Sequence, residues 1–157
     1  MLSHRNLTSN FISSSKLLPL EKEHKVLGVL PLCHVYERMM NYAYQYKGIS
    51  IYYAENLGTI ANDLKSVRPH AFNAVPRLIE RFYDRIIAVG KDLKCIKKRM
   101  FFWAVKLGLR YKLKKGNGWW YEQKLKIARK LIFSKWQKAM GGNIIIIISG
   151  GSALQPR

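Results

Sequence analysis

Three short segments hold the residues of this chain whose types and spacing could do chemistry. Residues 31–34 end in His34, a histidine able to act beside a substrate, and residues 75–77 end in Arg77, a cation able to pair with a carboxylate. Residues 149–154 contain the consecutive glycines Gly150 and Gly151. Each segment also has a structural interpretation: a histidine that caps a helix, an arginine on a helix surface, and a strand-to-helix turn. Residue types alone leave both interpretations open.

The predicted strands place these three segments at one edge of a sheet. Apolar runs predict strands at residues 26–30, 49–53, 71–75 and 144–148, with helices between them and breakers at Pro31, Gly48 and Pro69. Strands that alternate with helices favour an α/β fold, with a mostly parallel sheet and helices on both faces. The strands are continuously apolar, as burial of both faces requires. Ligands in such sheets bind beyond the carboxyl ends of the strands, where the three segments lie.

Helical periodicity predicts an apolar face or stripe on each of several helices. Ser3 can cap a helix that runs to about Lys16, and the helix at residues 34–46 has one apolar face. A helix that begins at Asn56 or Thr59 runs to Val67, and residues 76–89 give a further helix. Residues 93–112 and 119–140 give an antiparallel pair inserted at about 93–140. Three of these helices, at residues 34–46, 93–112 and 119–140, each have one apolar stripe. The stripes are Val35, Met39, Tyr42 and Tyr46; Leu93, Ile96, Met100, Trp103, Leu107 and Tyr111; and Tyr121, Leu125, Ala128, Ile132, Trp136 and Ala139.

The charge of the chain is strongly positive and unevenly spread. Twenty-eight lysines and arginines against nine acidic residues give a net charge of +19, and the stretch from Lys91 to Lys138 holds 16 basic and 2 acidic residues. These lysines could form a solvated face, or they could contact an anionic membrane surface, because tryptophan and lysine on one helical element suit a headgroup interface. Specific binding of nucleic acid is disfavoured, since no recognition motif accompanies the charge.

Four segments, in this order along the chain, resemble those of one family. The stretch LPLCHVYER at residues 30–38 resembles the LPLxHxxER segment of long-chain acyl-CoA synthetases, and AVPRLIE at residues 74–80 resembles their VPRLxE segment. SGGSAL at residues 149–154 is similar to the GGAxL loop of the wider adenylate-forming superfamily. LSHRNL at residues 2–7 resembles the helix that follows the phosphate loop of that superfamily. The resemblance covers essentially the whole chain.

The resemblance implies an AMP-forming long-chain fatty acid–CoA ligase, which uses ATP, Mg²⁺ and CoA to convert a fatty acid to an acyl-adenylate and then to acyl-CoA. It implies that His34 lies near the acyl carbonyl and the access route of CoA, and that Val75 and Pro76 wall the acyl site. It also implies that Gly150, Gly151, Ser152 and Ala153 approach the adenylate through their backbone, which glycine permits because it has no side chain. Ser152 replaces a common alanine, and Arg38 occupies a position where some relatives carry a tryptophan gate, so no gate residue is assigned.

The sequence also departs from a complete ligase of this family. It has no serine-, threonine- and glycine-rich loop followed by Pro-Lys, no YGxTE segment and no lysine-bearing C-terminal domain. We therefore expect residues 1–157 to be a partial AMP-binding domain that lacks the upstream phosphate loop and the C-terminal domain. We expect such a fragment to be inactive, to contain no complete catalytic set and no metal site, and to bind none of the three cofactors tightly.

Composition limits the remaining classes of protein. No apolar run approaches a membrane span, the N-terminus shows no secretory signal, and Cys33 and Cys95 have no metal-ligand spacing. We therefore expect a cytoplasmic protein with reduced thiols, which could be peripheral on the inner face of a membrane. The alternative to a ligase fragment is a small basic α/β adaptor that docks on anionic membranes without catalysis.

Overall fold

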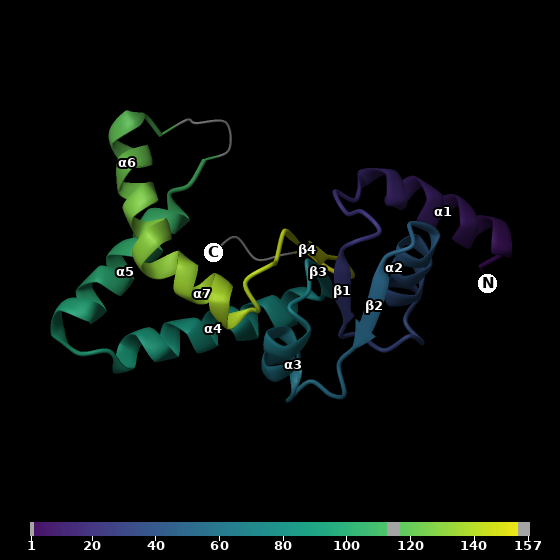
Figure 1. Cartoon of the computed structure of the whole chain (residues 1–157), viewed down its shortest axis with the longest axis horizontal. Helices are drawn as coiled ribbons and strands as arrows, with labels where there is room; N and C mark the ends of the chain where they lie inside the picture. Colours follow the sequence, from purple (N-terminus) through teal and green to yellow (C-terminus); the bar gives the residue numbers. More distant parts are fainter. Residues whose placement is uncertain (1, 113–116, 154–157) are drawn as a thin grey trace. The chain divides into compact units, whose positions relative to one another are not determined.

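A computed structural model describes residues 2–112 and 117–153 of the chain. These residues form two compact units, of which the first comprises residues 2–76 and 139–153 and the second comprises residues 77–112 and 117–138. Figure 1 shows the elements of both units in chain order. Each unit contains a hydrophobic core of its own.

The first unit is built on a four-stranded sheet. Its strands are β1 (Lys25–Gly28), β2 (Ser50–Tyr53), β3 (Ala71–Ala74) and β4 (Ile146–Ser149), in the spatial order β2-β1-β3-β4. All three pairings are parallel, and the register sets Leu27 beside Tyr52 and beside Phe72. The predicted parallel sheet is therefore confirmed, with strand boundaries shifted by one or two residues.

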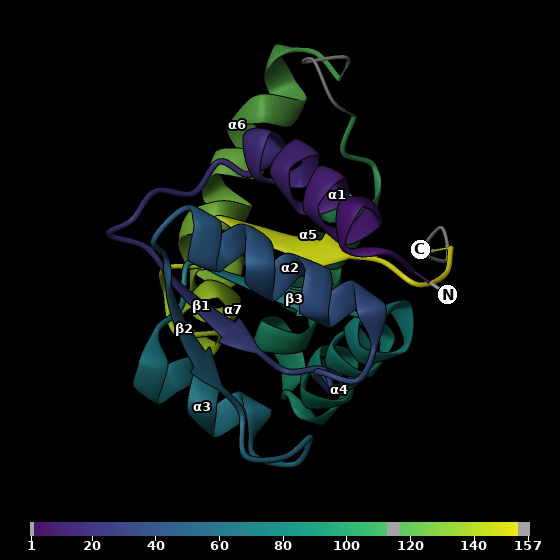
Figure 2. The same cartoon turned by 90° about the vertical axis from the view of Figure 1, so that its right-hand side faces the viewer.

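Helices cover both faces of this sheet. Helix α2 (Val35–Tyr46) lies on one face with α1 (His4–Leu17) packed on its outer side, and α3 (Ile60–Val67) lies on the other face (Figures 1 and 2). Ser3 caps α1 as predicted, because its Oγ accepts the Asn6 backbone N–H at 3.2 Å. Successive strand residues point to opposite faces. Val26 and Ala71 therefore join the core beneath α2, whereas the equally buried Leu27 and Phe72 point to the face of α3.

The face that α2 turns to the sheet combines apolar and polar side chains: Met40 and Tyr44 join the hydrophobic core, and Glu37 and Asn41 are buried on the same helix. The predicted apolar face contacts α1, where the Phe11 ring lies 6.0 Å from the ring of Tyr42 and 5.8 Å from that of Tyr46. Polar side chains can be buried on the sheet side because the strands and the helix supply their hydrogen-bond partners. The buried residues of α2 are Glu37, Met40, Asn41, Ala43 and Tyr44.

The second unit is helical. It contains α4 (Pro76–Asp92), α5 (Cys95–Leu109), α6 (Trp119–Ala128), the π-helical turn η2 (Arg129–Phe133) and α7 (Ser134–Ala139). Helices α5 and α6 are antiparallel, because the Tyr121 hydroxyl near the start of α6 donates to the Leu107 carbonyl near the end of α5 at 2.7 Å. The predicted basic helical pair is thus confirmed, with a π-helical turn inside its second helix.

The apolar stripe predicted for α5 was only partly right. Ile96 is 73% exposed and Trp103 is 37% exposed, so neither belongs to the core. Ala104 and Leu107 of α5 share a buried cluster with Leu125 and Ala128 of α6, so this face of α5 is the buried one. The buried residues of α5 are Phe101, Ala104 and Leu107, whereas the core of the pair on the other helix includes Tyr121, Leu125, Ala128 and Ile132, as predicted.

Two further observations concern the described residues as a whole. No helix within residues 2–112 and 117–153 is both long enough and apolar enough to cross a membrane. Cys33 and Cys95 are free and exposed.

Candidate functional site

The carboxyl ends of the four strands meet at one edge of the sheet because all the strands run parallel. Gly28, Tyr53, Ala74 and Ser149 end β1, β2, β3 and β4. The chain leaves this edge through residues 29–34, residues 54–59, Val75 and the turn that begins at Gly150. The three segments singled out from the sequence therefore all start at the edge where parallel α/β sheets bind their ligands.

Tyr36 joins the start of α2 to the end of β4. Its hydroxyl donates to the carbonyl oxygen of Ile148 at 3.0 Å. Its ring lies against Gly150, where an added Cβ would come within 2.7 Å of a ring carbon. Burial and the neighbouring Glu37 raise the pKa of Tyr36 to about 12, so the hydroxyl stays protonated and keeps donating. Glycine at position 150 is therefore required by the aromatic ring above it.

Glu37 is a fully buried carboxyl group beneath this edge. Its Oε1 accepts from Asn41 Nδ2 at 3.2 Å, and its Oε2 accepts from Asn73 Nδ2 at 2.9 Å. Burial raises the pKa of Glu37, and the two amide hydrogen bonds partly oppose that rise. Glu37 is held by these two amides and Arg38 is exposed, and neither residue forms a salt bridge among the described residues.

Two tyrosines extend the hydrogen bonds of Glu37 into a network that spans the sheet. Tyr44 donates to Asn73 Oδ1 at 2.6 Å, and Tyr53 donates to Asn41 Oδ1 at 2.7 Å. No buried side-chain nitrogen or oxygen of residues 2–112 and 117–153 lacks a partner. Because the network joins α2 to β2 and β3, it fixes the position of the helix whose first turn follows His34.

His34 lies directly before α2 and is exposed. Its backbone N–H donates to the Pro31 carbonyl at 3.0 Å, and its side chain makes no capping hydrogen bond. The imidazole is therefore not used by the helix and is open to solvent at the carboxyl edge of the sheet. This location is compatible with the role near the substrate that the sequence suggested, which stays a prediction.

Val75 and the glycine turn lie next to each other. The Gly150 N–H donates to the Ala74 carbonyl at 3.3 Å, and a Cβ added at Gly151 would lie 3.9 Å from Val75 Cγ1. Gly151 has φ +89°, a conformation that side chains disfavour. Pro76 is buried, whereas Ser152 and Ala153 are exposed. The structure thus brings together Val75 and Gly151, two residues 76 positions apart that the sequence assigned to one site.

Arg77 lies on the surface of α4, which is the second of the two interpretations that its sequence left open. Its guanidinium lies 3.5 Å from the Glu80 carboxylate one turn along α4, and its side chain is 79% exposed. The carboxylate that it pairs with is therefore one of its own helix.

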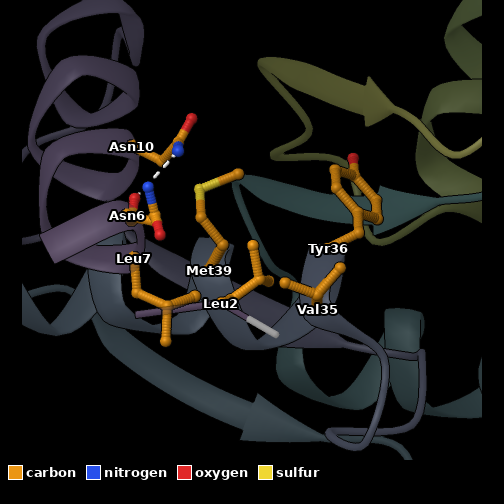
Figure 3. A pocket seen from close by; sticks show the side chains of 7 residues that line it. All are labelled: Leu2, Asn6, Leu7, Asn10, Val35, Tyr36 and Met39. Atoms are coloured by element: carbon orange, nitrogen blue, oxygen red, sulfur yellow. Dashed lines mark hydrogen bonds between the residues drawn. The ribbon is translucent and has the colours of Figure 1, made fainter. Parts of the chain in front are cut away.

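A shallow pocket opens between α1 and the first turns of α2. Its volume is about 270 Å³, and Figure 3 shows Leu7, Met39 and Val35 turned toward it. The wall is mainly apolar, because only two of its seven lining residues are asparagines. One of them, Asn10, uses its Nδ2 to donate to the Asn6 carbonyl at 2.8 Å. Sequence reasoning missed this pocket, because its residues come from two helices whose contact no local pattern reveals. The lining residues are Leu2, Asn6, Leu7, Asn10, Val35, Tyr36 and Met39.

Comparison with known proteins decides the family. The sequence model of the AMP-binding enzymes matches residues 1–157, the whole chain. The chain belongs to this family. This segment of an AMP-binding enzyme thus contains a parallel sheet, a glycine turn beyond one strand, and a buried polar network beneath the same edge.

Curated relatives to which this AMP-binding family member is similar are long-chain acyl-CoA synthetases and ligases. The long-chain-fatty-acid–CoA ligase ACSBG2 of Xenopus laevis is 36% identical over 150 residues, which cover 90% of this chain and 20% of the relative. The peroxisomal long chain acyl-CoA synthetase 6 of Arabidopsis thaliana is 32% identical, covering 99% of this chain and 22% of the relative. The long-chain-fatty-acid–CoA ligase 1 of Cavia porcellus is 29% identical, with 97% and 22% covered.

These matches confirm the resemblance seen in the sequence. The chain spans about a fifth of the length of the curated relatives that it matches. No solved structure gives a significant match. The AMP-binding family uses ATP, Mg²⁺ and CoA in its ligases. Among the described residues, no group of three or more histidine, cysteine, aspartate or glutamate side chains could hold a metal ion.

Proposed function

We propose that this chain forms part of the adenylating domain of a long-chain fatty acid–CoA ligase. One observation carries the proposal: α2, Val75 and the glycine turn converge at the carboxyl edge of the sheet, where Tyr36 covers Gly150 and Gly151 faces Val75. The relatives named above are long-chain fatty acid ligases and synthetases, which supports the same substrate class.

The proposed reaction has two steps. A carboxylate oxygen of the fatty acid attacks the α-phosphorus of ATP, which gives an acyl-adenylate and releases pyrophosphate. The CoA thiol then attacks the acyl carbonyl, and AMP leaves. Mg²⁺ supplies charge stabilisation to the phosphates when bound, but we assign it no ligand because no metal-binding group occurs among the described residues.

The family resemblance suggests each proposed role, and the location of the residue is compatible with it. His34 would stand near the acyl carbonyl and the access route of CoA, since it is exposed and free of capping bonds at the start of α2. Val75 and Pro76 would wall the acyl site. The turn from Gly150 to Ala153 would approach the adenylate through its backbone, and Gly151 helps because no side chain projects from it toward Val75.

We also propose that the 157-residue polypeptide by itself makes no acyl-CoA, as a partial AMP-binding domain without the phosphate loop and the C-terminal domain. Attack of a carboxylate on a phosphate brings two anions together, and donors and a metal must stabilise the transition state. Loss of one such donor costs on the order of 100-fold in rate. We expect no pyrophosphate and no acyl-CoA from ATP, Mg²⁺, CoA and palmitate. Turnover above a protein-free blank would refute this proposal.

A chimera tests the ligase proposal in the positive direction. The chain would replace the matching 150 residues of the Xenopus relative, with formation of palmitoyl-CoA as the readout. We expect activity well above that of the same protein with the segment deleted. Circular dichroism and a cooperative melting transition would establish that the chimera folds. A folded chimera with no activity would contradict the proposed function.

A peripheral contact with an anionic membrane, on the cytoplasmic side, is a second proposal. It is supported by the exposure of every described lysine and arginine from Lys91 to Lys138. Asp92 and Glu122, the acidic residues of that stretch, form no salt bridge among the described residues, so the positive charge is not neutralised locally. A membrane-docking adaptor without catalysis, considered from the sequence, finds no support in the comparisons, which match ligases and synthetases.

A further inference from the structure

The end of the helical pair where α5 stops and α6 begins exposes large apolar side chains. Leu109 and Tyr111 are 54% and 49% exposed, and Trp119 and Trp120 are 63% and 74% exposed. Tryptophan is a large side chain that normally buries most of its surface. Two adjacent tryptophans left in solvent are therefore the kind of surface that binds a partner.

Further large apolar side chains are exposed along the second helix. Ile127 is 53% exposed and Leu131 is 40% exposed. Together with Trp120 they recur at spacings of seven and four, so they share one side of α6 and η2. That side differs from the buried side of Tyr121, Leu125, Ala128 and Ile132. We call Leu109, Tyr111, Trp119, Trp120, Ile127 and Leu131 the exposed apolar face.

The helical pair holds this face in place. The Tyr121 hydroxyl donates to the Leu107 carbonyl at 2.7 Å, and Asn117 Nδ2 donates to the Arg110 carbonyl at 2.8 Å. Both hydrogen bonds join the end of α5 to the start of α6, where the two tryptophans project. The face is therefore presented by a folded hairpin with its own core, and it does not need to form on binding.

Basic side chains surround the exposed apolar face. Arg110 and Lys112 flank Tyr111, and Lys124, Lys126 and Lys130 lie between and beside Trp120, Ile127 and Leu131; all five are exposed. The partner must therefore combine anionic groups with an apolar layer directly behind them. The surface of an anionic lipid bilayer has this arrangement, with phosphate and carboxylate headgroups above the acyl chains.

A single-stranded nucleic acid would also match the charge, but it fits the apolar groups less well. Stacking platforms present aromatic rings flat to successive bases. Here the rings of Trp119 and Trp120 stand at 75° to each other. The aliphatic Leu109, Ile127 and Leu131 offer no ring to a base, whereas they suit an acyl boundary.

We propose that the exposed apolar face inserts into the interface of an anionic lipid bilayer, with Trp119 and Trp120 entering deepest. The inference deepens the membrane proposal above and rests on it for the identity of the partner. It does not depend on the ligase reaction, because binding and insertion need neither ATP nor CoA. It names the inserting residues, which charge alone could not identify.

The test uses the 157-residue chain with vesicles of phosphatidylcholine, alone or mixed with phosphatidylserine. All four tryptophans of the chain, at positions 103, 119, 120 and 136, lie in the helical unit, so their emission reports on it directly. We expect co-sedimentation with the mixed vesicles, release by salt and a blue shift of the emission. Salt should act because exposed charges are screened over about 10 Å at 0.1 M.

Matched variants separate insertion from charge attraction. W119S/W120S should weaken binding to the mixed vesicles about tenfold and abolish the blue shift, whereas W103S, at a less exposed tryptophan outside the face, should retain both. K124Q/K130Q should weaken binding more than K16Q/K65Q, which removes the same charge from the first unit. Circular dichroism would verify that each variant folds.

The outcomes distinguish the proposals. Binding with no blue shift, and equally tight binding by W119S/W120S, would overturn insertion and leave a screened charge contact. Equal binding to neutral vesicles, or none to the mixed vesicles, would overturn both membrane proposals. Tighter binding to single-stranded RNA than to the mixed vesicles would favour nucleic acid and overturn the inference. None of these results would bear on the ligase proposal, which the chimera tests separately.

Discussion

Replacing Glu37 with alanine tests whether the buried network holds α2 on the sheet. The change removes the acceptor of Asn73 Nδ2 at 2.9 Å and one acceptor of Asn41 Nδ2 at 3.2 Å. Asn41 Nδ2 keeps its second hydrogen bond, to the Glu37 backbone carbonyl at 2.9 Å. Asn73 Nδ2 is therefore the donor that loses its acceptor. Tyr44 donates to Asn73 Oδ1 at 2.6 Å, and rotation of the Asn73 amide would sacrifice that bond.

The magnitude follows from these contacts. Each buried donor left without a partner costs about 1–3 kcal/mol, and a small cavity adds to the loss. Removal of a desolvated carboxyl group offsets part of it, since burial raises the pKa of Glu37. The net loss in free energy of unfolding should be about 2–4 kcal/mol. For a chain of this size, that corresponds to a decrease in melting temperature of roughly 5–15 °C.

The assay is thermal unfolding followed by far-ultraviolet circular dichroism, with urea unfolding as a second measure. Tryptophan emission reports only the helical unit, so a loss confined to the first unit should appear in the dichroism and not in the emission. Glu55→Ala is the matched control, since Glu55 is exposed, and it should change stability by no more than about 0.5 kcal/mol. If Glu37→Ala and Glu55→Ala have the same melting temperature, the network does not hold the helix on the sheet.

Two further predictions concern the edges of the sheet. Gly150→Ala should lower the free energy of unfolding by about 1–3 kcal/mol, because its Cβ would come within 2.7 Å of the Tyr36 ring. The control is Gly108→Ala, where the nearest atom to the added Cβ is 3.5 Å away. Equal melting temperatures for the two variants would contradict the contact between Gly150 and the ring. Burial and nearby charge lower the pKa of His70, whose Nδ1 accepts the Lys25 N–H at 3.0 Å. The folded state therefore favours neutral His70. The contribution of His70 to the free energy of unfolding is present above the pKa of about 6.5 in the unfolded chain, and it is lost as the pH falls from that value through the lower pKa of the folded state. Urea midpoints at about pH 7.5 and 5.5 should show a larger loss for the wild type than for His70→Gln, and equal losses would refute the assignment.

Much of the fold was accessible from local sequence. Runs of apolar β-branched residues and the breakers Pro31, Gly48 and Pro69 predicted the four strands to within two residues. Such signals depend on neighbours in the chain, so they survive without knowledge of the tertiary structure. Alternation of strands and helices then limited the sheet to parallel pairing.

The order of the strands followed from no local signal. The sequence did not indicate that β1 lies between β2 and β3. It also did not indicate that β4 pairs with β3, from which the helices α4 to α7 separate it in the chain. These pairings are between segments far apart in the chain, and many orders satisfy the same periodicity. The tertiary structure decided them through the burial of both faces.

The residues of the candidate site divide in the same way. His34, Val75 and Gly150–Gly151 were found from motifs, whereas Tyr36 and Asn73 were missed. Their importance comes from partners distant in sequence, Ile148 for Tyr36 and Glu37 for Asn73, and neither residue is a fixed position of a motif. A tyrosine two residues after a histidine gives no sign that it will cover a glycine more than a hundred positions later.

By itself the sequence determined the family, the strands with their breakers and the excess of positive charge, because each is a property of residue types in order along the chain. Only the tertiary structure decided which face of α2 is buried. The apolar face contacts α1, and Glu37, Asn41 and Tyr44 turn to the sheet. A polar side chain is stable in the interior when its partners are present, and those partners, Asn73 and Tyr53, come from strands that only folding brings to the helix.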